Sequence, residues 1–353
     1  MRRHAITRRD ILKAATALPL VFAAPARAAA PPAEAITPAL ITAAKKEGEL
    51  VWYTSADLQL AEKIAKAFEQ KFPGIVARVE RAGAERIFTR VGQEYSAGIH
   101  KVDAANTGDA AMFVDWKRQG LLQPYVPEDV AKNFASDYRD PDGVYAMVRS
   151  TLCIIAYNTD LVKREDAPKS LNDLLDPKWA GKLVKGNPSY SGTIITSTYQ
   201  LVRVLGWSYL EKLSKQKVMQ VQSATDTPKR VILGERPVMV DGNEYNVLIA
   251  KESGKPIEPV YATEGSPIVL MPSAIFAAAP HPNAARLFQN FLFTAEAQQL
   301  FVDVGGLRSV HRLVKDKPGR TPLSAIKIMN VEPDAMITQI EEIKRRYTEY
   351  FRV

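Results

Sequence analysis

The chain has one cysteine among its 353 residues, so it cannot form an internal disulfide. Cys153 lies in the apolar stretch STLCIIAYN, which predicts a buried and unreactive thiol rather than a catalytic one. Histidine is also scarce. Beyond residue 28 only His100, His281 and His311 occur, and none of them has the spacing to cysteine or to another histidine that is typical of a zinc site.

Motifs of catalysis are missing as well. The sequence contains neither a Gly-x-Ser-x-Gly turn nor a local Ser/His/Asp or Cys/His signature. We therefore expect a protein that is not an enzyme and that carries no cofactor. Beyond the N-terminal segment no apolar run reaches the ~20 residues of a membrane-spanning helix, so we expect none.

A strong excess of one charge is missing once the N-terminal segment is set aside. Residues 1–28 hold six of the 47 basic residues and one of the 39 acidic residues, which lowers the net charge of the remainder from +8 to +3. The remainder has no dense Lys/Arg stripe and no RNA-binding signature, so we expect no nucleic acid partner.

Residues 1–28 have the features of an export signal. The paired Arg8 and Arg9 precede a short apolar run, and Ala26-Arg27-Ala28 fits a small-x-small cleavage site. The position of the arginine pair favours the twin-arginine type, and an ordinary secretory signal is the alternative. Either signal places the mature chain in the periplasm.

Apolar extended stretches alternate with stretches of helical spacing from about residue 38 to 120, and again from 160 to 262. Such alternation predicts an α/β fold with mainly parallel sheets covered by helices on both faces. Two long extended runs interrupt it, within 140–158 and over 266–279, with no helix inside either. These runs suit strands that cross between two lobes.

Ligands of open α/β sheets bind beyond the carboxyl ends of the strands, where the next helix begins. This rule selects five polar loops, which are rich in hydroxyl, amide and glycine groups and suit a polar or anionic ligand. They are Tyr53 to Ser55, Arg81 to Gly83, Asn106 to Asp109, Asn187 to Thr193 and Asp241 to Tyr245.

Four stretches resemble the solute-binding proteins of bacterial ABC importers, type II, extracellular family 1. They occur in the family's order: GLLQPY (120–125), AYNTDLV (156–162), LLDPKWAGKL (174–183) and HPNAARLFQNFLFTAEAQQLF (281–301). The resemblance covers nearly all of the chain beyond the signal. Within this family, the chain is similar in particular to the branch that binds ferric iron, thiamine, sugar phosphates and phosphonates.

The resemblance implies a two-lobe type II periplasmic binding protein fold, with two hinge strands and a ligand held between the lobes. Residues 29–149 and 268–330 would form lobe 1, residues 150–267 would form lobe 2, and residues 331–353 would add a C-terminal helix packed on lobe 1. The implied partners are a small-molecule or ion ligand and an inner-membrane ABC permease. We expect a monomer. A sensor domain that docks on a membrane receptor would use the same recognition and stays open as an alternative.

The loop GNPSYSGT (186–193) resembles the second-lobe loop that grips phosphate or carboxylate in anion-binding relatives. We therefore expect a phosphonate, sugar phosphate or carboxylate as ligand, with Arg81 and Arg149 as counter-charges. The other predicted contacts are polar or glycine residues of the selected loops, several of which could instead cap a helix or a turn: Thr54, Ser55, Thr107, Ser189, Ser191, Gly192, Thr193, Asn243, Glu244 and Tyr245.

Ferric iron is the alternative ligand. Ferric binders of this branch carry adjacent tyrosines near the stretch matched here by VMVDGNEYNVL, and phenolates suit a hard cation. This sequence has Glu244 and Tyr245 there, so only Tyr245 matches. Glu244 is itself a hard oxygen donor, which keeps these two residues open as an alternative metal site.

Overall fold

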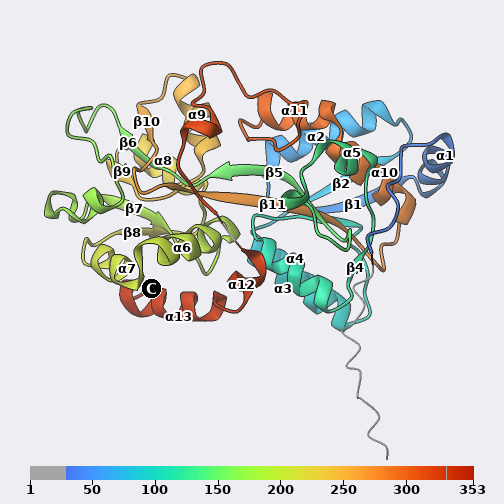
Figure 1. Cartoon of the computed structure of the whole chain (residues 1–353), viewed down its shortest axis with the longest axis horizontal. Coiled ribbons are helices and arrows are strands. Elements are labelled where there is room, and N and C mark those ends of the chain that lie inside the picture. Colours follow the sequence, from blue (N-terminus) through green and yellow to red (C-terminus); the bar gives the residue numbers. More distant parts are fainter. Residues whose placement is uncertain (1–28, 331) are drawn as a thin grey trace, which may run out of the picture.

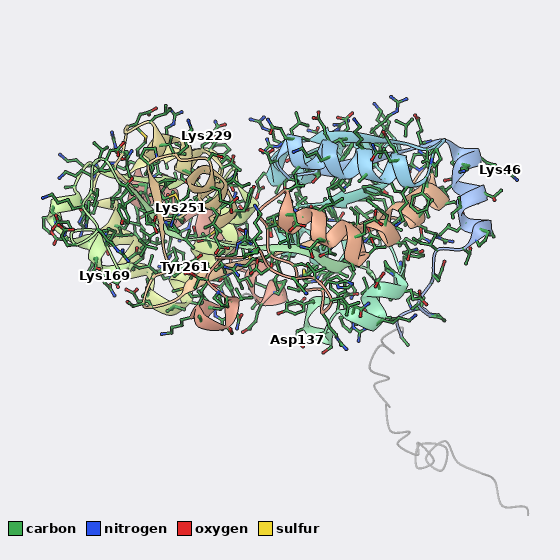
Figure 2. The ribbon with its side chains drawn as sticks, turned by 90° about the horizontal axis from the view of Figure 1, so that it is seen from above. Lys46, Asp137, Lys169, Lys229, Lys251 and Tyr261 are labelled. Carbon is green, nitrogen blue, oxygen red and sulfur yellow. The ribbon has the colours of Figure 1, made fainter. Side chains whose placement is uncertain are left out.

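A computed structural model describes residues 29–330 and 332–353, so the predicted export signal over 1–28 lies outside the described residues. The chain forms two helix-covered lobes side by side along its long axis (Figure 1). Seen from above, Lys46 marks the outer end of one lobe and Lys169 that of the other (Figure 2). The predicted α/β fold is confirmed, and both of its sheets are mixed, with parallel and antiparallel strand pairs.

Each lobe is built on one sheet. In the described part of the chain the first sheet has seven strands, in the order β12-β11-β3-β1-β2 with β4 and β5 also paired to β11, and the second has five, in the order β10-β6-β9-β7-β8. The first consists of β1 (Glu49–Thr54), β2 (Val76–Arg81), β3 (Ala104–Asn106), β4 (Leu122–Gln123), β5 (Ala146–Leu152), β11 (Ser266–Phe276) and β12 (Ile328–Met329). The second consists of β6 (Ile155–Asn158), β7 (Leu183–Gly186), β8 (Met219–Val221), β9 (Val238–Met239) and β10 (Ile257–Val260).

Helices cover both faces of the first sheet, which agrees with the apolar residues that β1 directs to both faces. Leu50 and Trp52 point into a core beneath one set of helices, whereas Tyr53 points into a separate core on the opposite face. A strand buried on both faces is apolar at successive positions, and this is the pattern in ELVWYT. The first set of helices comprises α1 (Pro38–Glu47), α2 (Leu58–Lys71), α5 (Glu128–Asn133), α10 (Pro282–Phe293) and α11 (Ala295–Asp303), and the second comprises α3 (Ala84–Ser96) and α4 (Ala110–Arg118).

The second sheet is covered in the same manner. Leu183 of β7 packs into one core and the next residue, Val184, packs into the core on the other face. The surrounding helices are α6 (Gly192–Leu205), α7 (Trp207–Ser214), α8 (Asp226–Ile232) and α9 (Glu244–Glu252).

The two long extended runs form the antiparallel pair β5 and β11, which passes through the centre of the molecule (Figure 1). A register shift between Met271 and Pro272 interrupts the pairing. Proline has no N–H to donate, and strands accept it at such irregularities. The division of the chain near residues 149/150 and 267/268 stays a prediction.

The C-terminal segment differs from its prediction, because it contacts both lobes. Helix α12 (Pro333–Ile337) packs on α4 of the first lobe, but the longer α13 (Ile340–Phe351) packs on α6 and α7 of the second. Tyr347 of α13 is fully buried; its hydroxyl donates to Gln220 Oε1 at 2.7 Å and lies 3.2 Å from the Gly186 carbonyl oxygen. The prediction placed this segment on lobe 1 alone, whereas α13 packs on α6 and α7 and also contacts the first lobe through Lys344 and Glu85. The amphipathic repeat of this helix marks a buried face but not the surface that covers it.

Candidate functional site

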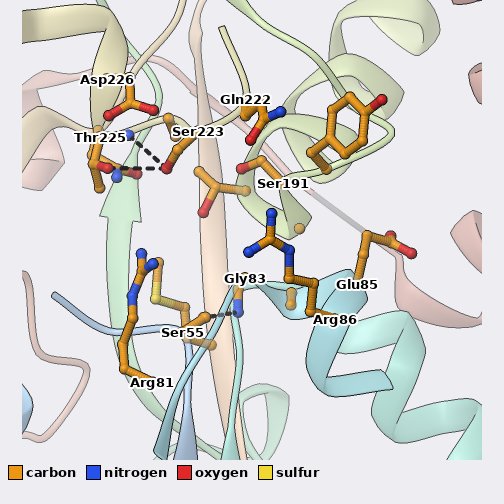
Figure 3. Close-up of a pocket in the computed structure, with 18 of the residues that line it drawn as sticks. Ser55, Arg81, Gly83, Glu85, Arg86, Ser191, Gln222, Ser223, Thr225 and Asp226 are labelled. Carbon is orange, nitrogen blue, oxygen red and sulfur yellow. Dashed lines mark hydrogen bonds between the residues drawn. The ribbon is translucent and has the colours of Figure 1, made fainter. Parts of the chain in front are cut away.

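A cavity of about 200 Å³ lies between the lobes, where several helices begin. Figure 3 shows Ser55, Arg81 and Arg86 of the first lobe on one side and Ser191, Ser223 and Asp226 of the second lobe opposite them. The two sides come from different parts of the sequence, so both lobes are needed to form the cavity. The complete lining is Ser55, Arg81, Gly83–Arg86, Gly108, Arg149, Tyr190–Thr193, Gln222–Asp226, Asn243, Tyr245 and Met271.

Several helices begin at or next to this cavity. Helix α3 begins after Gly83, α4 after Asp109 and α6 after Ser191, whose hydroxyl accepts from the Ile194 N–H at 3.4 Å. The first N–H groups of a helix lack partners within the helix, and the helix dipole adds a partial positive charge at this end. The cavity therefore favours an anion.

The lobes touch each other directly at these helix starts. A Cβ atom added at Gly192 would lie 2.8 Å from the Asp109 Cβ and 2.9 Å from the Ala84 Cβ. One added at Gly108 would lie 2.8 Å from the Thr193 hydroxyl oxygen. Glycine at both positions thus allows the starts of α4 and α6 to approach each other across the cleft.

Arg149 is the most deeply buried charge of the cavity. It is 2% exposed, and its Nε donates to Asn106 Oδ1 at 2.8 Å. Its Nη2 is buried and has no hydrogen-bond partner among the residues that the structure describes. No carboxylate lies within ion-pair distance of it in the described part of the chain. Loss of hydration lowers the pKa of Arg149 to about 10. A buried guanidinium without a counter-ion is a strong site for an oxyanion.

Arg81 and Arg86 add two more guanidinium groups, and Figure 3 shows both of them directed across the cavity. Within residues 29–330 and 332–353 neither forms an ion pair with a carboxylate, although Arg81 Nε donates to the Ala56 carbonyl at 3.3 Å. The two acidic residues of the lining are partly neutralised, since Asp226 pairs with Lys229 (3.2 Å) and Glu85 with Lys344 (3.2 Å). The balance of charge in the cavity is positive.

The structure brings eight of the twelve predicted contacts together at the cavity. Three of the others, Thr54, Thr107 and Ser189, lie outside its lining and form hydrogen bonds within their own loops. The Thr54 hydroxyl accepts from the Ala56 N–H, the Thr107 hydroxyl from the Asp109 N–H, and the Ser189 N–H donates to Asn187. The eight residues are Ser55, Arg81, Arg149, Ser191, Gly192, Thr193, Asn243 and Tyr245, and their binding role stays a prediction.

Glu244, the fourth predicted residue outside the lining, is occupied by other groups. Its two carboxylate oxygens accept from Nε and Nη2 of Arg308, each at 2.8 Å, and one of them also accepts from the Tyr261 hydroxyl at 2.6 Å. The side chains of Glu244 and Arg308 are almost fully buried. Glu244 is therefore the anion of a buried ion pair, which argues against its role in the alternative metal site.

Tyr245 lines the cavity as the neutral phenol. Burial raises its pKa to about 12, and the nearby Arg149 offsets only part of that rise. Its hydroxyl accepts from Asn243 Nδ2 at 3.3 Å. Among the described residues no group of three or more His, Cys, Asp or Glu side chains has the geometry of a metal site. Tyr245 and Glu244 thus offer a poor pair of ligands for a hard cation.

Sequence reasoning missed the loop Gln222 to Asp226 and the side chain of Arg86. The loop obeys the same rule as the five selected loops, since it connects β8 to α8, and the letters QSATD have the same hydroxyl-rich character. β8 has three half-buried residues, so no apolar run marked it as a strand. Arg86 lies in the first turn of α3, where sequence alone does not indicate which way it points.

Two further expectations concern single features of the chain. Cys153 is 2% exposed, so the prediction of a buried thiol is confirmed. Burial raises its pKa, which is the direction expected of an unreactive thiol. The described residues include no helix that is both long and apolar enough to cross a membrane.

Asp109 carries a pH dependence that can be measured. It is fully buried beside the cleft, and its Oδ2 has no hydrogen-bond partner among the described residues. Burial and the charge of Glu85 raise its pKa from 3.8 to about 7, against smaller lowerings by the Ala111 N–H and by Lys344. Below pH ~4 the carboxyl is protonated in both the folded and the unfolded chain, so its full contribution to stability is present. As the pH rises toward about 7 the unfolded chain ionises more readily than the folded one, and that contribution is lost.

We expect Asp109→Asn to melt at the same temperature as wild type near pH 4 and at a higher temperature above pH 7. The gain in the free energy of unfolding above pH 7 should be on the order of a few kcal/mol, at about 1.4 kcal/mol per pKa unit. Asparagine keeps the acceptor for the Ala111 N–H. Thermal unfolding from pH 4 to 8 measures the difference. Asp57→Asn, which removes an exposed capping carboxylate, is the control. A difference for Asp109→Asn that does not change with pH would contradict the prediction.

Comparison with known proteins gives the class of protein. The family model described as bacterial extracellular solute-binding protein matches residues 102–323, more than half of the chain. The chain belongs to this family of solute-binding proteins, whose members act outside the cytoplasm.

Individual relatives agree with that family. The chain is 24% identical over 228 residues to a probable ABC transporter periplasmic-binding protein of Sinorhizobium fredii, which covers 62% of this chain and 63% of the relative. Among solved structures it is similar to the fructose-6-phosphate-bound periplasmic binding protein AfuA of Actinobacillus pleuropneumoniae, with a TM-score of 0.80, 22% identity and coverage of 87% of this chain and 99% of that one. It is also similar to iron-bound HitA of Pseudomonas aeruginosa, with a TM-score of 0.74, 21% identity and coverage of 85% and 99%. These structures confirm the two-lobe fold.

Proposed function

We propose that this protein captures a small anionic solute, of the phosphonate, sugar phosphate or carboxylate type, as the periplasmic binding component of an ABC importer. The observation that carries the proposal is Arg149, a buried guanidinium of the interlobe cavity that has no counter-ion among the described residues. A ligand oxyanion would supply the missing partner. Contacts from both lobes to one ligand would favour the closed state, and domain opening would release the ligand to the permease.

The relatives support this proposal at a coarser level. One structural neighbour holds fructose 6-phosphate, and one sequence relative is described as a probable ABC transporter component. We infer that the chain acts as a monomer, without catalysis, and that it reaches the periplasm by the twin-arginine route. A ligand-loaded sensor that docks on a membrane receptor is the alternative use of the same cavity.

Ferric iron remains a second candidate because HitA, which shares the fold, is iron-bound. The cavity favours it less. Glu244 is held by Arg308, and the raised pKa of Tyr245 opposes the phenolate form that a ferric ion requires. Three nearby arginines would also repel a cation.

The test is to purify the chain from Ala29 onward without chelator, and to combine native mass spectrometry with iron analysis and calorimetric titration. We expect an organic anion of a few hundred daltons to be bound, or binding of fructose 6-phosphate or a phosphonate on titration, with no stoichiometric iron. Bound iron with a visible tyrosinate band that disappears in Tyr245→Phe would reverse the ranking of the two ligands.

A further inference from the structure

The buried Arg149 is held by one side chain, that of Asn106. Arg149 lies on β5 and Asn106 at the end of β3, and both strands pair with β11 between them. Arg149 Nε donates to Asn106 Oδ1 at 2.8 Å, and Asn106 is itself fully buried. The guanidinium is thus fixed to the sheet through its Nε, while its Nη2 has no partner in the described part of the protein.

The amide of Asn106 has its orientation set by β11. Its Nδ2 donates to the Pro272 carbonyl at 2.7 Å and approaches the Met271 carbonyl at 3.5 Å. Carbonyl oxygens only accept hydrogen bonds, so the NH₂ side must face β11 and the oxygen must face Arg149. These two carbonyls stand at the register shift between β5 and β11, where the regular ladder is interrupted.

Position 106 must accept a hydrogen bond from Arg149 and donate one to the Pro272 carbonyl. An amide does both without adding charge. A carboxylate at position 106 would also accept from Arg149, but it would neutralise the guanidinium and place a second anionic oxygen against the Pro272 carbonyl. An arginine that already has a carboxylate partner gains less from a ligand oxyanion. Elsewhere the chain does pair a buried arginine with a carboxylate, as Arg308 with Glu244, and that arginine lies outside the cavity.

We propose that Asn106 is a positioning residue that directs the Arg149 guanidinium at the ligand while leaving its positive charge available, and that its being an amide rather than a carboxylate determines anion affinity. The inference rests on the anion-binding function proposed above. It assigns a specific role to a residue that does not itself line the cavity.

The decisive variant is Asn106→Asp, which changes one NH₂ group to oxygen. The matched control is Asn158→Asp. Asn158 is a buried asparagine of β6 whose Nδ2 donates to the Val231 carbonyl at 2.8 Å and whose Oδ1 accepts from the Asp160 N–H at 2.9 Å, away from the cavity. Both substitutions lose a donor to a buried carbonyl, so their effects on thermal stability should be similar. The affinity of the chain from Ala29 onward for fructose 6-phosphate, or for the anion found by native mass spectrometry, is measured by titration calorimetry.

We expect Asn106→Asp to weaken binding at least 30-fold and Asn158→Asp to leave it within twofold. Asn106→Ala, which frees Arg149 without neutralising it, should weaken binding less than Asn106→Asp does. Because Asn106 acts through the charge of Arg149, the additional loss caused by Asn106→Asp should shrink to threefold or less in an Arg149→Gln background, which has no charge to neutralise. A merely structural role would not produce this order or this dependence on Arg149.

Three results would overturn the proposal. Asn106→Asp could bind as tightly as Asn158→Asp, Asn106→Ala could bind as weakly as Asn106→Asp, or the effect could persist undiminished in the Arg149→Gln background. If Asn106→Asp does not fold, Asn106→Ala compared with Asn158→Ala decides, with at least a threefold loss expected for the first alone. A wild-type chain that binds no anion at all would instead overturn the proposed function, and this inference with it.

Discussion

Arg149→Gln is expected to weaken anion binding by on the order of 30- to 3,000-fold. The loss of one partner from a desolvated charge pair costs about 2–5 kcal/mol, and each 1.4 kcal/mol is a factor of ten in affinity. The unliganded protein should melt at the same temperature or higher, because the substitution removes a buried charge that has no carboxylate partner among the described residues. Loss of binding together with retained stability separates a ligand contact from a structural residue.

Titration calorimetry and thermal unfolding of the same preparations measure the two quantities. Arg345→Gln is the control, since Arg345 lies on α13 with its side chain 65% exposed and paired with Glu349 at 3.5 Å. It should change neither affinity nor stability appreciably. An Arg149→Gln protein that binds its anion as tightly as wild type would remove the observation on which the proposed function rests.

Arg308→Met is expected to give the largest loss of stability, about 3–5 kcal/mol in the free energy of unfolding. It leaves the carboxylate of Glu244 buried, with the Tyr261 hydroxyl as its remaining partner. An unpaired buried charge is costly because neither water nor a counter-ion replaces the lost interaction. Urea unfolding followed by circular dichroism measures the effect.

The matched control is Arg345→Met, which breaks an exposed pair and should cost at most about 0.5 kcal/mol. The double variant Arg308→Met with Glu244→Leu should recover much of the loss, because neither charge of the pair then stays buried without a partner. If Arg308→Met and Arg345→Met were equally stable, the assignment of Glu244 to a structural ion pair would be wrong, and its role as a metal ligand would reopen.

The two arginines show how environment separates residues of the same type. Arg308 and Arg149 are both buried, yet one is closed off by a carboxylate and the other is held by an amide at the edge of a cavity. The first ties α9 to the segment after α11, and the second keeps its charge free at the junction of the lobes. Burial alone therefore does not identify a binding residue, whereas burial without a counter-ion does point to one.

Much of the site could be predicted from a local rule. Ser55, Arg81, Ser191 and Thr193 were predicted because they stand where a strand ends and a helix begins, and all four line the cavity. The rule works because the carboxyl ends of parallel strands share one edge of a sheet. The rule does not indicate which way a side chain points. It therefore also selects Thr54 and Thr107, although their hydroxyls form hydrogen bonds with the backbone of their own loops.

The sequence by itself determined the alternation of strands and helices, the two long crossing strands, the buried cysteine and the polar loops, because each depends on the order of apolar and polar residues along a short stretch. Only the tertiary structure decided which charges have partners. Glu244 became structural because Arg308, 64 residues away, lies against it, and α13 was placed on the second lobe by contacts with α6 and α7. Asn106 and Arg149 meet because β11 brings β3 and β5 together. Such pairings depend on distance in space, which residues far apart in the chain acquire only when the whole fold forms.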